Sequence, residues 1–300
     1  MAYATLKLEY EPELVILTFS RPEKRNAISP EMLEELMAAL DELDNSQARV
    51  GIITGAGKAF CAGMDLESLR TLAAEPAGLR EPSTSGVLDV TVRVLKGTTE
   101  EGPSPQSGEL PPSEAAREDS RRMARLFRRL YEFPKPLIAA VNGPAVAGGC
   151  GIATLCDFTL AAPEAKFGYT EVRIGFLPAL VSIFLVRQIG EKRARDLLLT
   201  GRIINAEEAR QLGLVNEVVA NDRLIAKARE LAAQLLESSP TSLAYTKRLL
   251  RELSQKELER ALELAIEANA SIRSTADFRE GISAFLEKRK AVWAGEDPKP

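Results

Sequence analysis

The stretch that decides the fold reads GPAVAGGCGIATLCD and covers residues 143–157. Its small residues Ala147, Gly148 and Gly149 lead into an apolar run, although a glycine inside a helix costs about 0.5–1 kcal/mol relative to alanine. A predicted strand over residues 136–143 precedes them, so we expect a helix to begin near Gly148. Two explanations for the small residues stay open. Either a ligand oxygen approaches the free N–H groups of the helix start, or another helix packs closely there.

A second glycine-rich loop reads GAGKAFCAGMDL over residues 55–66 and also joins a predicted strand to a predicted helix. Such a loop can direct backbone N–H groups at a ligand, as the first one can. Two loops of this kind could bracket a single oxygen from two sides. That arrangement stabilises an oxyanion, and each donor is typically worth about 10²–10³ in rate.

Predicted strands alternate with helices through the first two thirds of the chain, which is typical of an α/β core. The strands are expected over residues 14–20, 50–55, 136–143 and 158–162, and Ser29 is expected to cap a helix over residues 30–43. An amphipathic, solvated helix is predicted over residues 121–133, with Met123, Leu126, Phe127 and Leu130 on its apolar face.

The domain organisation predicted from these patterns has three parts. Residues 1–200 form the core and residues 201–300 form a helical region. The sequence pattern itself becomes helical almost throughout from about Ile189. Residues 71–120 are rich in Pro, Gly, Ser and Glu and interrupt the core. This insertion is predicted to be a disordered surface segment, with a lid over a binding site as the alternative.

Composition excludes several classes of site and partner. The 39 Lys and Arg residues against 43 Asp and Glu residues give a net charge of −4, which does not favour nucleic acid or a membrane as a partner. The chain has no histidine, which removes His-based dyads and metal sites. Its three cysteines are expected to be reduced and buried, and we expect no metal. The N-terminus lacks a signal-peptide pattern, so a cytoplasmic location is predicted.

Five segments together resemble the crotonase (enoyl-CoA hydratase/isomerase) superfamily: FCAGMDL, AAVNGPAVAGGCGIATLCDF, FGYTEVRIGFLP, LTGRIINAEEARQLGLVNEVV and EGISAFLEKRKAVW. The segment over residues 170–190 is similar to bacterial methylglutaconyl-CoA-type hydratases. The resemblance implies an α/β fold of repeated ββα units, with a C-terminal helical region that assembles trimers or hexamers. It also implies an acyl-CoA substrate, with coenzyme A as part of that substrate and no separate cofactor.

The resemblance also implies the catalytic residues. The backbone N–H groups of Met64 and Gly148 match the oxyanion hole of the family, and Glu171 matches the glutamate that exchanges a proton with the acyl chain. A second glutamate of typical hydratases would stand at Gly151 and is missing, while Asp157 is interpreted as a structural carboxylate. Hydration of a 2-enoyl-CoA is the expected reaction. The alternatives are a Δ3,Δ2-enoyl-CoA isomerase with Glu171 as the sole proton shuttle, and a non-catalytic acyl-CoA or RNA-binding relative.

The resemblance places the coenzyme A contacts in two regions of the chain. The backbone near Ala62 is expected to contact the adenine and pantetheine groups. The further candidates are Lys24, Arg25, Ala27 and, in the C-terminal tail, Lys288. Glu23 occupies the usual first basic position of the family.

Overall fold

The computed structural model describes residues 3–65, 114–174, 178–253, 289 and 292 of the chain. The chain divides into two compact units, Met1–Asp65 with Ala124–Pro300, and Leu66–Met123. The helix expected after Asp65, most of the 71–120 insertion, the helices expected after Leu253, and Lys288 lie outside the described residues. The boundary at residue 200 between core and helical region stays a prediction, as does the lid formed by residues 71–120.

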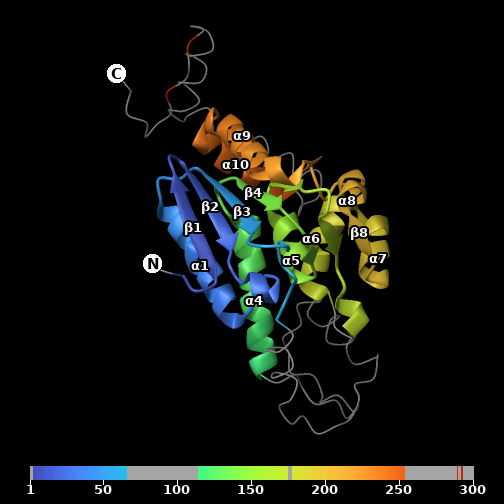
Figure 1. Ribbon diagram of the computed structural model, residues 1–300. Helices are drawn as coiled ribbons and strands as arrows, with labels where there is room; N and C mark the ends of the chain where they lie inside the picture. Colours follow the sequence, from blue (N-terminus) through green and yellow to red (C-terminus); the bar gives the residue numbers. More distant parts are fainter. Residues whose placement is uncertain (1–2, 66–113, 175–177, 254–288, 290–291, 293–300) are drawn as a thin grey trace. The chain divides into compact units, whose positions relative to one another are not determined.

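The main sheet of the first unit is largely parallel (Figure 1). Its order is β1-β2-β3-β4-β6-β9, with β1 antiparallel to β2 and the other neighbours parallel. The strands are β1 (Leu6–Glu11), β2 (Leu14–Phe19), β3 (Val50–Gly55), β4 (Leu137–Val141), β6 (Phe158–Ala161) and β9 (Glu217–Val218). The four predicted strands are confirmed at β2, β3, β4 and β6.

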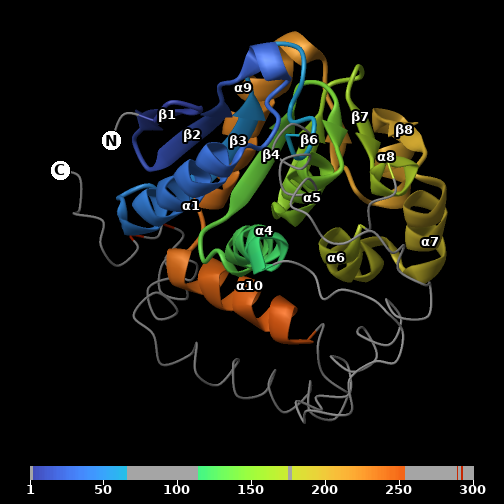
Figure 2. The ribbon, with the colours of Figure 1, turned by 90° about the horizontal axis from the view of Figure 1, so that it is seen from below.

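Helices cover both faces of this sheet (Figure 2). Nearly every position of the central strands is therefore buried. Leu224, Ala228 and Ala232 of α9 (Leu224–Leu236) pack on one face. On the other face lies α1 (Pro30–Asn45), where a Cβ at Gly51 would come within 2.8 Å of Leu43. The predicted cap is confirmed, because the Ser29 side chain accepts a hydrogen bond from the Met32 N–H.

A smaller sheet, β5-β7-β8, stands beside the carboxyl end of the main one. It consists of β5 (Ala145–Val146), β7 (Lys166–Gly168) and β8 (Ile203–Asn205). The helices after these strands are α5 (Gly148–Leu155), α6 (Ala179–Ile189), α7 (Glu191–Thr200) and α8 (Ala206–Leu212). The order β1-β2-α1, β4-β5-α5, β6-β7-α6 is the repeated ββα pattern that the resemblance implied.

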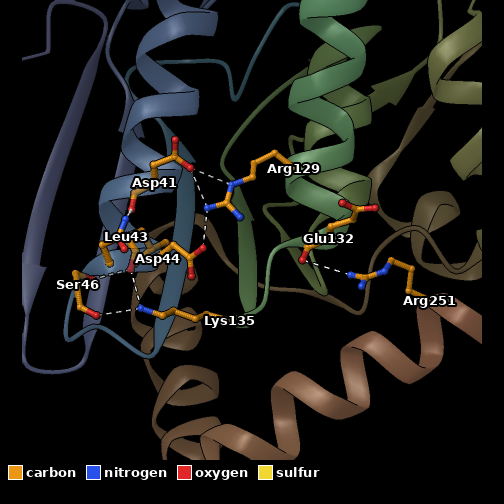
Figure 3. A network of polar contacts seen from close by, with 9 residues as sticks. Asp41, Leu43, Asp44, Ser46, Arg129, Glu132, Lys135 and Arg251 are labelled. Carbon is orange, nitrogen blue, oxygen red and sulfur yellow. Dashed lines mark hydrogen bonds and ion pairs between the residues drawn. The ribbon is translucent and has the colours of Figure 1, made fainter. Parts of the chain in front are cut away.

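A polar network fastens α4 (Glu114–Glu132) to the carboxyl end of α1 (Figure 3). Arg129 pairs with Asp41 at 2.9 Å and with Asp44 at 2.8 Å. Lys135 donates to the carbonyls of Leu43, in the last turn of α1, and of Ser46, which follows the helix. Leu126, Phe127 and Leu130 of α4 are fully buried, as expected for the predicted apolar face.

Side-chain hydrogen bonds also join the loop after α4 to α10 (Pro240–Leu253). Lys247 of α10 donates to the Lys135 carbonyl and to Asp157, and Asp157 accepts a hydrogen bond from the Leu137 N–H. Asp157 is thus a structural carboxylate at the start of β4, as predicted. Among the described helices, none combines the length and the apolar character needed to cross a bilayer.

Candidate active site

The two glycine-rich loops pack against each other main chain to main chain. Val146 N–H donates to the Cys61 carbonyl at 2.9 Å, and Cys61 N–H donates to the Pro144 carbonyl at 3.1 Å. A Cβ at Gly149 would lie 2.4 Å from the Cys61 carbonyl oxygen, closer than real contacts allow. The missing side chain at Gly149 is therefore explained by close packing, against the second loop rather than against a helix.

The backbone beside Met64 is turned so that its N–H faces away from the neighbouring strand. Ile28 N–H donates to the Gly63 carbonyl and Asp65 N–H donates to the Ile28 carbonyl, which makes a parallel bridge between Ile28 and Met64. In such a bridge the N–H and C=O of Met64 itself point the opposite way. A Cβ at Gly63 would be 3.6 Å from the Gly148 nitrogen, so this part of the second loop lies beside the start of α5.

The helix that starts at Gly148 is preceded by a strained residue. Ala147 has φ 50° and ψ −125°, a conformation that glycine tolerates and other residues adopt at a cost of about 1–3 kcal/mol. The Ala147 N–H bonds to Gly168, and the Ala147 carbonyl accepts from Gly151. Within the described residues no backbone carbonyl accepts from the N–H of Gly148 or of Met64. Both N–H groups are thus available to an oxygen, and the α5 dipole favours negative charge there.

Glu171 follows β7, which runs parallel to β5. Val146 pairs with Gly168, so the residues that follow both strands leave the small sheet together. The Glu171 side chain is 8% exposed, and its Oε2 has no hydrogen-bond partner among the described residues. Burial raises the pKa of this carboxyl. A carboxyl group in dry surroundings, with a raised pKa and an unused oxygen, is suited to proton transfer.

The space beside Gly151 is apolar and filled. A Cβ at this position would lie 2.8 Å from the Phe127 ring and 2.9 Å from Val181 of α6. Phe127 also meets Phe184 edge to face, with ring centroids 6.4 Å apart. Gly151 stands one turn after Gly148 on the same side of α5. Where the resemblance expects a second carboxylate, this chain therefore has an aromatic and aliphatic wall.

The candidate coenzyme A residues before α1 lie against the second loop. Ala62 N–H donates to the Arg25 carbonyl at 3.0 Å, and Ala27 N–H donates to the Lys24 carbonyl at 3.0 Å. Lys24 and Arg25 are exposed, whereas Ala27 and Ala62 are half-buried. The structure thus brings Lys24, Arg25, Ala27 and Ala62 together.

Asn26 organises this region and was missed by the sequence analysis. It is fully buried, has φ 55°, and its side-chain amide donates to the carbonyls of Ala56 and Ala59. Asparagine is one of the few residues that adopt positive φ readily. That preference, inside RPEKRNA, is the signal that could have found it.

The cysteines are free and buried, as predicted. Burial raises the pKa of the Cys61 and Cys150 thiols to about 12, so neither is a thiolate near neutral pH. Within the described residues no group of three or more Cys, Asp or Glu side chains is placed to hold a metal ion.

Known proteins resemble this chain along most of its length. The sequence pattern described as enoyl-CoA hydratase/isomerase matches residues 9–92 and 109–296. The chain belongs to this family. A Thermus thermophilus protein named "Putative enoyl-CoA hydratase" is 43% identical over 277 residues, which are 92% of this chain and 95% of that protein. The crotonyl-CoA hydratase of Syntrophomonas wolfei is 34% identical over 97% of this chain and 98% of that protein.

Solved structures of the family share the fold. The enoyl-CoA hydratase from Bacillus anthracis superposes with a TM-score of 0.79 at 31% identity, over 97% of this chain and all of that one. The expected crotonase fold is confirmed, and the chain is an enzyme of the enoyl-CoA hydratase/isomerase family. The likeness to methylglutaconyl-CoA-type hydratases in particular stays a prediction.

Proposed function

We propose that the enzyme adds water reversibly to the double bond of a 2-enoyl-CoA. The backbone N–H groups of Met64 and Gly148 hold the thioester oxygen, and Glu171 moves the proton. The observation that supports the proposal most is the packing of two loops whose Met64 and Gly148 N–H groups have no backbone acceptor among the described residues. The buried Glu171 carboxyl follows β7, the strand that pairs with β5. Relatives named as hydratases support the same reaction class.

The proposed steps need one carboxylate and one oxyanion hole. The water oxygen bonds to the β-carbon while the electron pair of the double bond moves toward the thioester oxygen, which gives an enolate. Glu171 takes a proton from that water and delivers it to the α-carbon. The N–H groups and the α5 dipole stabilise the enolate more than the neutral thioester, and for this reason they accelerate the step. The thioester itself acidifies the α-carbon, so we propose no metal or redox cofactor.

The test is Glu171→Gln, which keeps the side-chain shape and removes the base. We expect turnover of crotonyl-CoA to fall by about 10²–10⁴-fold, while affinity for coenzyme A esters stays within a few-fold of wild type. The matched control is Glu164→Gln, an exposed carboxyl in the turn between β6 and β7. Undiminished turnover by Glu171→Gln would contradict the proposal. Binding without turnover of any enoyl-CoA by the wild type would instead favour a non-catalytic relative.

A second candidate, the Δ3,Δ2-enoyl-CoA isomerase, is favoured by the apolar wall at Gly151. One carboxyl can carry a proton between two carbons, and a dry wall keeps water away from the enolate. The two reactions separate when 3-enoyl-CoA and 2-enoyl-CoA esters are supplied and the products are weighed by mass spectrometry. A product heavier by one water contradicts a pure isomerase, and conversion of a 3-enoyl-CoA without any mass gain contradicts the hydratase.

The finer parts of the proposal concern the rest of the substrate and the assembly. We propose that the Ala62 backbone and the cluster of Lys24, Arg25 and Ala27 hold coenzyme A, with Lys288 as a further contact outside the described residues. We also propose that residues 201–300 assemble the enzyme into a trimer or a hexamer, and that it works in the cytoplasm.

A further inference from the structure

We propose that the hydroxyl group of Tyr169 is a positioning device for Glu171, because it fastens the end of β7 to the interior of α5. This inference rests on the proposed role of Glu171. It adds a residue to the site that neither touches the substrate nor belongs to the oxyanion hole.

Tyr169 lies between β7 and Glu171 and is one of the largest fully buried side chains of the described residues, at 1% exposure. Its hydroxyl is 3.2 Å from Thr154 Oγ1 in the second turn of α5. Thr154 Oγ1 is itself within 3.0 Å of the Cys150 carbonyl and 3.2 Å of the Gly151 carbonyl. The Tyr169 hydroxyl is therefore held by the Thr154 side chain of the helix that begins at Gly148.

Burial raises the pKa of Tyr169 well above its ordinary value, so the phenol stays neutral over any working pH. A buried hydroxyl costs free energy unless it is hydrogen-bonded, and a phenylalanine ring would fill the same space without that cost. The ring of Tyr169 supplies the packing, and the hydroxyl adds only the hydrogen bonding to α5.

These bonds matter because nothing holds the Glu171 Oε2 directly within the described residues. The position of the carboxyl is instead set by the backbone that carries it. That backbone is tied to α5 at two points, the bond from Ala147 N–H to the Gly168 carbonyl at 2.7 Å and the Tyr169 hydroxyl. Tyr169 stands two residues before Glu171, so the tie to α5 acts on the short segment that carries the carboxyl. Loss of one tie would let the carboxyl move and let water reach it.

The first test is Tyr169→Phe, which keeps the ring and removes the oxygen. We expect kcat to fall about tenfold with KM within threefold of wild type, because a displacement of about 1 Å can cost far more in rate than in binding. We also expect the acid limb of the pH–rate profile to move down by at least half a pH unit, since solvated Glu171 loses part of its raised pKa. Tyr245→Phe, at a partly exposed tyrosine of α10, is the matched control and should change neither quantity.

The second test approaches the same bond from α5. Thr154→Val removes the partner oxygen and should reproduce both effects, whereas Thr154→Ser keeps the oxygen and should restore most of kcat. The double variant Tyr169→Phe/Thr154→Val should lose no more than either single variant, because both remove one shared contact. Wild-type kcat and an unmoved pH profile in folded Tyr169→Phe and Thr154→Val would overturn the inference.

A titration separates this inference from the proposed function. The Glu171 carboxyl can be followed by ¹³C NMR, with Glu171→Gln to assign its signal. If Glu171→Gln stays active, the proposed function fails, but the titration still tests the anchor. A lower Glu171 pKa in Tyr169→Phe than in wild type supports the inference, and identical titrations overturn it.

Discussion

The carboxyl of Glu171 predicts how activity and stability depend on pH. Its pKa is raised by burial, and the proposed mechanism needs the ionised form. We therefore expect kcat/KM to fall on the acid side with an inflection above about 4.3, the value of an ordinary glutamate. Folding favours the protonated form of such a group, so stability is lost as the pH rises through the folded pKa. Glu171→Gln should raise Tm at pH 7 and leave it nearly unchanged at pH 4. A lower Tm at pH 7 would contradict this sign.

Gly149 and Gly151 give a matched pair of substitutions within one helix. Gly149→Ala drives its methyl group against the Cys61 carbonyl, which is backbone and cannot yield without separating the two loops. We expect a loss of about 1–3 kcal/mol in the free energy of unfolding and at least a hundredfold loss of turnover. Gly151→Ala meets only the side chains of Phe127 and Val181, so its cost is smaller and is partly offset by helix propensity. Equal losses in urea melts and in activity would argue against this difference.

Single residues could be predicted wherever a motif names them. Glu171, Met64 and Gly148 come from the resemblance, and the structure packs the backbones beside Met64 and Gly148 together. Tyr169 carries no such signal, because an aromatic residue after a strand usually belongs to the core. Its importance depends on Thr154, fifteen residues earlier, and only the packed fold brings the two together.

At the scale of elements, two glutamates of α1 fasten the amino-terminal strand. Glu35 accepts hydrogen bonds from the N–H groups of Ala4 and Thr5 and from the Thr5 hydroxyl. Glu42 accepts from the hydroxyls of Tyr3 and Tyr10. Burial alone would raise the Glu35 pKa, but the hydrogen bonds together outweigh burial and lower it. The strand is therefore held best when Glu35 is ionised.

Glu35→Gln should lower the free energy of unfolding by about 1–2 kcal/mol at pH 7. A lowered folded pKa contributes stability above the unfolded value of about 4.3, and that contribution is lost as the pH falls through the folded pKa. The difference in Tm between Glu35→Gln and wild type should therefore shrink in acid. Glu34→Gln, an exposed neighbour on α1, is the control and should show neither effect. A constant Tm difference between pH 7 and pH 3 would contradict the argument.

The long, regular elements could be predicted because their signals are local. The cap at Ser29, the period of α1 and the apolar runs of β2 and β3 depend on neighbours in sequence. The helix α6 was missed, since ALVSIFLVRQI is apolar on nearly every side and includes branched residues typical of strands. The strands β5, β7 and β8 were missed because two or three residues carry no period, and their pairing depends on partners far along the chain.

For the whole molecule, alternating strands and helices predicted an α/β core, while the repeated ββα order came from the resemblance alone. Neither could predict what fills the space beside Gly151. Phe127 and Val181 come from α4 and α6, which lie before and after α5 in the sequence. Contacts of that kind are decided only when the layers pack.

The interlocked main chains of the two glycine-rich loops restrict how this enzyme could be redesigned. Exchanging either loop for a longer or bulkier one would require both to be rebuilt, since carbonyl oxygens rather than movable side chains fill the gap between them. The wall formed by Phe127 and Val181 has no such constraint. Trimming those two side chains would open space beside Gly151 without moving the backbone, so under the proposed function a change of acyl preference is best sought there.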